Sequence, residues 1–144
     1  MPLVKEKRLA SGLMLARYYL PSTELGAAAL TQEVPLVTLP ADACVVSVTV
    51  DLKTDFTDAG SISSVTLQVG STASDDSNSF FTALEVMSGS PANKRYEQRG
   101  VWQSGDGLAV RCLATATGAN LGTGSATSLD GGAAEIDIVY FVAE

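Results

Sequence analysis

Apolar and polar residues alternate along much of the chain, most regularly between residues 43 and 53. One set of alternating positions in this segment is apolar: Cys44, Val46, Val48, Val50 and Leu52. The other set is mainly polar: Val45, Ser47, Thr49, Asp51 and Lys53. A period of two residues with one apolar side is typical of a half-buried antiparallel strand. We therefore predict a strand over residues 43–53 and a turn over residues 54–60.

Similar alternation, or a composition typical of strands, marks other parts of the chain. The segments predicted as strands are residues 13–20, 33–40, 61–70, 94–103, 108–117 and 133–142. Residues 80–87 fit either a strand or one helical turn, and a short helix is the alternative for residues 5–16. Pro35 limits its segment to an edge strand or an extended segment, because proline donates no hydrogen bond to a sheet.

Three of these segments have clear apolar sides that we expect to face a core. The expected core positions are Val65, Leu67 and Val69, then Leu108, Val110, Cys112, Ala114 and Ala116, then Ala134, Ile136, Ile138, Tyr140 and Val142. The last segment also carries Val139 and Phe141 on its other side, which predicts a central or interface strand. Residues 118–132 are small, polar and rich in glycine, and we expect them to form a long flexible hairpin loop.

The number and spacing of these segments predict the fold class. About eight short strands, frequent turn signals and no long helix indicate an all-β protein, an antiparallel β-sandwich of jelly-roll type. The length of 144 residues suits one domain. We place the sandwich at residues 33–144 and assign residues 1–32 to an extended N-terminal arm and linker.

The charge is unevenly distributed along the chain. The formal net charge is -7. Residues 1–17 contain four basic residues and one acidic residue, a net of +3, whereas the rest contains 5 basic and 15 acidic residues, a net of -10. An acidic body repels phosphate backbones, so we expect no nucleic-acid partner. The basic start is either an arm that docks on an acidic surface or a solvated terminus.

The first twenty residues carry no secretory or membrane signal that we recognise. Their apolar run is interrupted by Arg17 and is too short to cross a bilayer. We therefore expect a soluble protein with no membrane partner, synthesised in a cytoplasm.

The absence of histidine limits the chemistry that the chain can support. The sequence contains no histidine, which removes the commonest general base and the commonest metal ligand. Cys44 and Cys112 are the two cysteines, and both lie in phase with apolar positions of predicted strands. We expect two buried thiols; a disulfide between facing sheets and a reactive thiol are the alternatives. We predict no catalytic residues, no metal site and no cofactor.

The acidic residues offer few binding motifs. Asp75 and Asp76 are adjacent, so on a strand they point to opposite sides; a solvated loop is favoured over a calcium site. Asp55 and Asp58 lie in the predicted turn, where we expect their side chains to accept hydrogen bonds from the backbone. The glycine-rich segment after residue 117 does not end in the Lys-Ser or Lys-Thr pair of a phosphate-binding loop.

Basic and aromatic residues cluster in one further place, residues 94–102. Arginine and aromatic side chains are enriched at binding hot spots. The cluster is a candidate subunit contact or sugar-stacking platform, and the alternative is a solvated strand with Trp102 in the core. Together with the basic start, it gives the set of candidate contact residues: Lys5, Lys7, Arg8, Arg17, Tyr18, Tyr19, Lys94, Arg95, Tyr96, Arg99 and Trp102.

A family resemblance rests on three segments in order. They are LPADACVVSVTVDLKTDFTDAGSISSVTLQVG, FFTALEV and SGDGLAVRCLATATGANLGTGSATSLDGGAAEIDIVYFV. Over roughly residues 36–142 they resemble the small jelly-roll structural proteins of tailed bacteriophages, although LPADA departs from the glycine-containing lead typical of these proteins. The resemblance implies a virion component on the capsid surface, most often a head decoration (cement) or head-fibre protein. It also implies a major capsid protein as partner, a homo-oligomer, commonly a homotrimer, and no catalytic residues.

Three functional hypotheses follow. The favoured one is a decoration protein that binds the outside of a phage head and stabilises it through multivalent contacts, with the basic N-terminal segment as an arm reaching a neighbour. The second is a tail or fibre module that binds a host glycan, with Tyr96 and Trp102 as the stacking residues. The third, a small jelly-roll hydrolase or isomerase, is disfavoured because the chain has no histidine.

Overall fold

The structure of the protein is a computed structural model. It describes the backbone of residues 4–8, 12–40, 43–58, 60–71, 81–87, 94–103 and 109–142, and the side chains of residues 12–40, 43–58, 60–70, 84–87 and 109–142. The described strands are β1 (Val4–Arg8), β2 (Met14–Pro21), β3 (Thr31–Thr38), β4 (Ala43–Thr57), β5 (Ser64–Ser71), β6 (Phe81–Glu85), β7 (Lys94–Gln103), β8 (Ala109–Thr117) and β9 (Gly131–Val142). A single 3-10 turn, η1 (Ser22–Glu24), follows β2.

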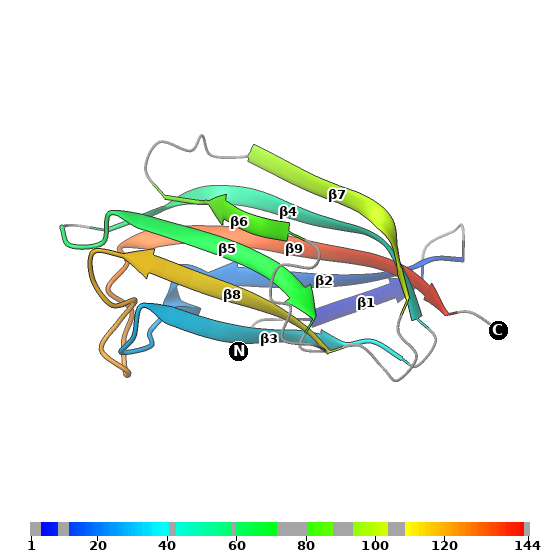
Figure 1. Ribbon diagram of the computed structural model, residues 1–144, viewed down its shortest axis with the longest axis horizontal. Helices are drawn as coiled ribbons and strands as arrows, with labels where there is room; N and C mark the ends of the chain where they lie inside the picture. Colours follow the sequence, from blue (N-terminus) through cyan, green and yellow to red (C-terminus); the bar gives the residue numbers. More distant parts are fainter. Residues whose placement is uncertain are drawn as a thin grey trace.

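The strands form two antiparallel sheets that pack face to face (Figure 1). One sheet has five strands in the order β1-β2-β9-β4-β7, and the other has four in the order β3-β8-β5-β6. Of strands β2 to β9, each sheet contains four, in the strand order of a jelly roll. Strand β1 is an additional edge strand that pairs with β2. The predicted all-β sandwich is confirmed, including a strand for the ambiguous residues 80–87. The helix considered for residues 5–16 is wrong, because β1 and β2 occupy this part of the chain.

The core lies between the two sheets and matches most of the predicted apolar sides. Buried residues alternate along β5 (Val65, Leu67, Val69), β8 (Val110, Cys112, Ala114, Ala116) and β9 (Ala134, Ile136, Ile138, Tyr140). Strand β9 is central in its sheet, as predicted from its apolar second half. Val142 is 44% exposed at the end of that strand, and Leu108 lies outside the described residues.

A bulge in β4 changes which side chains face the core. The pairing of β4 with both β7 and β9 shifts between Val45 and Ser47. One extra residue in a strand reverses the sides of all residues beyond it. Val45 is therefore a core residue together with Val48, whereas Cys44 is buried outside the core cluster. The prediction that Cys44 shares a face with Val48 is wrong for this reason.

Strand β4 also runs further than predicted. It ends at Thr57, with two more register shifts against β9 after Leu52. Asp55 therefore lies in the strand, not in a turn. The turn begins at Asp58, whose Oδ2 accepts hydrogen bonds from the backbone N–H of Ser61 at 3.0 Å and of Ile62 at 2.6 Å. The predicted role of Asp58 in the turn is confirmed.

Part of the predicted N-terminal arm belongs to the sandwich. Strand β2 pairs with β9 along its whole length, from Met14 opposite Tyr140 to Pro21 opposite Ala133. Ala16, Tyr18, Leu20 and Leu25 are all buried in the core. The boundary at residue 32 is corrected here, because β2 is a strand of the five-stranded sheet and Leu25 after it belongs to the core. Alternating apolar residues in this segment suit a strand with one buried face.

The loop between β8 and β9 packs against the chain that precedes β3. Backbone N–H groups of Leu121, Gly122 and Gly124 donate to the carbonyls of Ala29, Ala27 and Gly26 at 2.9, 2.8 and 2.8 Å. Leu121 and Leu129 are buried. The predicted hairpin is wrong, because β8 and β9 belong to different sheets. The loop between them packs through backbone hydrogen bonds and two buried leucines.

Both cysteines are free and buried, as expected, and the disulfide alternative is not formed. Burial raises the pKa of the Cys112 thiol from 9.0 to about 12. The Cys112 thiol therefore ionises at a lower pH in the unfolded state than in the folded state. Its contribution to the free energy of unfolding is complete below pH 9 and is lost as the pH rises towards 12.

We expect the free energy of unfolding to fall with pH more steeply for the wild type than for the Cys112→Ala variant. Urea unfolding at several pH values between about 8 and 11 measures both slopes. Equal slopes for the two proteins would show that the thiol does not ionise on unfolding.

In the described part of the chain, no helix is long and apolar enough to span a membrane.

Candidate functional site

The face of the five-stranded sheet that points away from the core brings charged and apolar side chains together. Strand register aligns Arg17 of β2 with Asp137 of β9, and Asp137 with Thr49 of β4. The next row aligns Tyr19, Glu135 and Asp51. We call this surface the outer face and define it by Leu15, Arg17, Tyr19, Ser47, Thr49, Asp51, Lys53, Glu135, Asp137, Val139 and Phe141.

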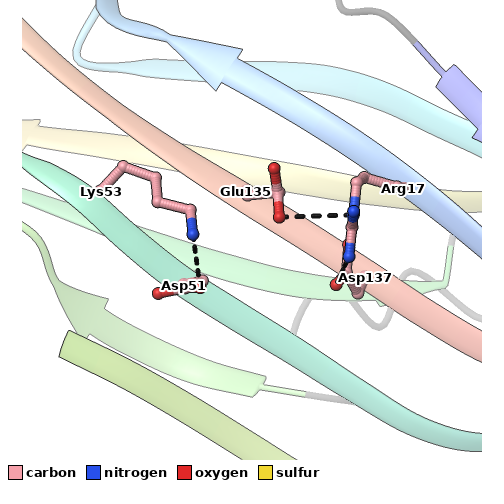
Figure 2. A network of polar contacts seen from close by, with 5 residues as sticks. All are labelled: Arg17, Asp51, Lys53, Glu135 and Asp137. Carbon is pink, nitrogen blue, oxygen red and sulfur yellow. Dashed lines mark hydrogen bonds and ion pairs between the residues drawn. The ribbon is translucent and has the colours of Figure 1, made fainter. Parts of the chain in front are cut away.

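Arg17 lies at the centre of an ion network on the outer face (Figure 2). Its Nε and Nη2 donate to Oδ1 and Oδ2 of Asp137 at 2.9 and 3.0 Å, which is a two-point interaction. The same Nε lies 3.3 Å from Oε1 of Glu135. The hydrogen bond to Asp137 and the charge of that carboxylate raise the pKa of Arg17, with a smaller contribution from Glu135.

A second ion pair lies beside this network on β4. Lys53 Nζ donates to Asp51 Oδ2 at 2.8 Å, and this hydrogen bond is the main reason that the pKa of Lys53 is raised. The Arg17 and Lys53 side chains are 44% and 43% exposed, so solvent screens both pairs and each contributes little to stability. We infer that the network fixes the positions of charges on the surface more than it stabilises the fold.

Apolar side chains adjoin these charges. Tyr19 is 45% exposed and Phe141 is 37% exposed, and Leu15 and Val139 are half-buried on neighbouring strands. Protein interfaces use such mixtures, with aromatic and arginine side chains as energetic centres. Among the described residues, no group of three or more His, Cys, Asp or Glu side chains forms a metal site.

The structure brings together only some of the predicted contact residues. Arg17 and Tyr19 lie on the outer face, two residues apart on β2. The predicted residues of β1 and β7 have a described backbone, but their side chains lie outside the described residues: Lys5, Lys7, Arg8, Lys94, Arg95, Tyr96, Arg99 and Trp102. Their register is known, with Tyr96 opposite Val50 and Trp102 opposite Val45.

Tyr18 is not a surface contact residue. Its side chain is only 6% exposed, because it points from β2 into the core. Its hydroxyl donates to the carbonyl oxygen of Pro35 in β3 at 3.0 Å, which ties the two sheets together. Burial raises the pKa of this phenol. The prediction failed because Tyr18 and Tyr19 are adjacent, and only the sheet register shows which one faces outward.

We expect Tyr18→Phe to lower the free energy of unfolding by about 1 kcal/mol, because it removes one hydrogen bond and leaves the Pro35 carbonyl unpaired. Thermal or urea unfolding measures the change. Tyr19→Phe is the matched control, since the Tyr19 side chain is 45% exposed, and its stability should stay within about 0.5 kcal/mol of wild type. Equal effects of the two substitutions would contradict the inter-sheet role of Tyr18.

The carboxylates of the outer face were not predicted as site residues. Asp51 and Lys53 on one segment, and Glu135 and Asp137 on another, are recognisable in the sequence as the polar sides of strands. Their juxtaposition depends on β4 pairing with β9, whose residues are more than eighty positions away in the chain. Strand pairing over such a distance has no local sequence signal.

The fold is similar to chains in three phage capsid structures. A chain of the Cyanophage Pam1 capsid asymmetric unit matches with a TM-score of 0.63 and 18% identity, covering 91% of this chain and 85% of that chain. A chain of the acidic stable capsid of Helicobacter pylori bacteriophage KHP30 matches with a TM-score of 0.62 and 17% identity, covering 99% and 95%. A chain of the capsid of Ralstonia phage GP4 matches with a TM-score of 0.55 and 18% identity, covering 99% and 92%.

These similarities concern the fold, since fewer than one residue in five is identical. No family model matches the chain, and no curated protein matches it. The coverage is high in both directions, so the likeness extends over the whole sandwich and not over a single sheet.

Proposed function

We propose that the protein is a structural component of a phage capsid, and specifically a decoration protein on the outside of the head. The observation that carries this proposal is the near full-length fold similarity to chains of three phage capsid structures. The resemblance of three sequence segments to small jelly-roll proteins of tailed phages points to the same role. We propose no enzymatic activity for the protein.

The physical properties of the chain suit this role. A sandwich with a continuous core is rigid, so little conformational entropy is lost when it binds to a lattice of capsid subunits. A net charge of -7 keeps free copies dispersed. We propose a homo-oligomer, commonly a trimer, because several weak contacts made by one assembly raise its overall affinity for the major capsid protein.

We propose the outer face as the surface that contacts a capsid or neighbouring subunit. Arg17 is held in place by Asp137, and Tyr19 is exposed beside it. An arginine fixed in this way needs little ordering on binding, and the exposed tyrosine beside it adds aromatic contact area. On β1 and β7, the residues whose strand partners belong to the outer face remain proposed contacts: Lys5, Lys7, Arg95 and Arg99. Lys94, Tyr96 and Trp102 pair with the core residues Leu52, Val50 and Val45, and Arg8 pairs with Met14, so the register does not align these four with the outer face.

Sedimentation with purified heads of the phage that encodes the protein, prepared without it, tests the proposal. We expect the wild type to pellet with the heads and the double variant Tyr19→Ala, Phe141→Ala to bind at least about tenfold more weakly. Leu30→Ala is the matched control, because Leu30 is 49% exposed but lies outside the outer face. Failure of the wild type to bind heads contradicts the decoration role. Equal loss in the control contradicts the role of the outer face.

The proposed arm is now confined to the first twelve residues. Within it, β1 pairs only with β2 at an edge of the sheet. Deletion of residues 1–12 should weaken binding to heads and leave the melting temperature within a few degrees of wild type. A large fall in melting temperature would place this segment in the structural body of the domain instead.

A further inference from the structure

The turn that joins β4 to β5 and the loop that joins β8 to β9 lie at the same end of the sandwich (left in Figure 1). Residues of both segments line a pocket. Its volume is about 450 Å³, within the usual range for small-molecule sites. The residues that line it are Asp58, Gly60, Ser61, Ile62, Ala119, Asn120, Gly122 and Ser128. None of them lies on the outer face.

Both walls of the pocket are held in place by hydrogen bonds. In the first wall, Asp58 accepts from the backbone of Ser61 and Ile62, and Ser63 N–H donates to the Thr117 carbonyl at 2.8 Å. In the second wall, Gly122 N–H donates to Ala27, and Ser128 N–H donates to Leu121, both at 2.8 Å. A pocket built in this way needs little ordering when a ligand binds.

The side chains of the pocket favour a neutral, hydroxyl-rich ligand. Ser61, Asn120 and Ser128 are exposed, and their hydroxyl and amide groups both donate and accept hydrogen bonds. Ile62 and Ala119 contribute apolar surface to the lining. Among the described residues of the lining, Asp58 is the charged one, and together with the net charge of -7 it disfavours anions.

A bound cation fits the pocket less well. The lining contains a single carboxylate, and hard cations such as Ca²⁺ take six to eight oxygen ligands, usually with several carboxylates. In the part of the chain that the structure describes, no cluster of potential metal ligands includes Asp58. A sugar matches the lining better, because its hydroxyls pair with the polar groups while its C–H face contacts Ile62 and Ala119.

We propose that this pocket binds a neutral saccharide. The described lining contains no aromatic side chain, so one copy should bind weakly, with a dissociation constant in the millimolar range. Many copies on one particle would add their affinities for a surface glycan. The proposal goes beyond the capsid role and concerns the isolated protein, so either claim can fail without the other.

Amide chemical-shift mapping of the full chain by NMR tests the proposal. The probes are glucose, galactose, mannose, N-acetylglucosamine and their common disaccharides, each titrated to high millimolar concentration. We expect at least one probe to shift the amides of the pocket residues. Asn120→Ala should weaken that binding about tenfold, the loss expected when one well-formed hydrogen bond is removed.

Ser125→Ala is the matched control, because Ser125 is exposed on the same loop but does not line the pocket. Its binding should equal that of the wild type. The proposal is wrong if no neutral probe shifts the pocket amides, or if the shifts persist unchanged in Asn120→Ala. Calcium and sialic acid are titrated in parallel, and a response to either one alone would overturn the assignment to a neutral ligand.

Discussion

Replacing Phe56 with alanine should lower the free energy of unfolding by about 3–5 kcal/mol, the range measured for large aromatic residues in cores. The Phe56 side chain is fully buried, and its backbone N–H donates to the Val86 carbonyl at 2.9 Å. Val86 in turn donates to Val65 of β5 at 3.0 Å. Phe56 therefore fills the core where the end of β4 meets the other sheet.

The backbone around Phe56 leaves little room for the structure to adjust. A Cβ atom at Gly132 would lie 2.6 Å from the Phe56 Cα, and Gly132 has a φ of +129° that favours glycine. Because β4 and β9 approach so closely here, the cavity left by Phe56→Ala should collapse only in part. This lack of relaxation places the expected loss towards the upper part of the range.

Urea unfolding followed by circular dichroism measures the effect. Phe141→Ala is the matched control, since the same side chain is removed from a site that is 37% exposed, and we expect a loss below about 1 kcal/mol. A Phe56→Ala protein as stable as the wild type would contradict the assignment of this residue to the core.

Replacing Gly122 with alanine should lower stability by about 1–3 kcal/mol, the usual cost of overpacking. A Cβ atom there would lie 2.3 Å from the Ala126 carbonyl oxygen and 2.5 Å from the Gly26 carbonyl oxygen. Both obstacles are backbone atoms, so a side-chain rotation cannot relieve the contact. The loop must move away from residues 26–29, which breaks its hydrogen bonds to Gly26 and Ala27.

Hydrogen exchange gives a local measure of this effect. The amides of Leu121, Gly122 and Gly124 should exchange faster in Gly122→Ala, while the amides of β5 and β8 should change much less. Gly60→Ala is the control, because a Cβ at Gly60 would have no atom within 4 Å. Unchanged exchange at Leu121 in Gly122→Ala would contradict the packing of this loop.

The sequence predicted the strands and the class of fold well, because these depend on local patterns. Alternation over residues 61–70 and 133–142 marked the buried positions of β5 and β9 correctly, except for Val142 at the exposed end of β9. The two main errors of the prediction arose from strand pairing and from a bulge, which the alternation of residues in a single segment does not reveal. The bulge at Val46 reversed the side of Cys44, and the pairing of β2 with β9 placed Tyr18 in the core.

The candidate sites were less predictable than the fold. Arg17 was named from the sequence, but its partners Glu135 and Asp137 lie over a hundred residues later and meet it only through sheet register. The polar pocket was missed for the same reason, since Asp58 and Asn120 come from different loops. The glycines around residue 122 suggested flexibility. In the structure, Gly122 permits a close approach of two backbone segments.

The central claim is that the protein is a component of the phage head surface. Immunogold labelling of intact phage particles with an antibody against the protein tests it most directly. The proposal predicts regular labelling over the head. Labelling confined to the tail or fibre tips would contradict the head location and favour the alternative of a host-binding module. Absence of labelling on every particle, with denatured virions also negative on an immunoblot, would contradict any role in the virion.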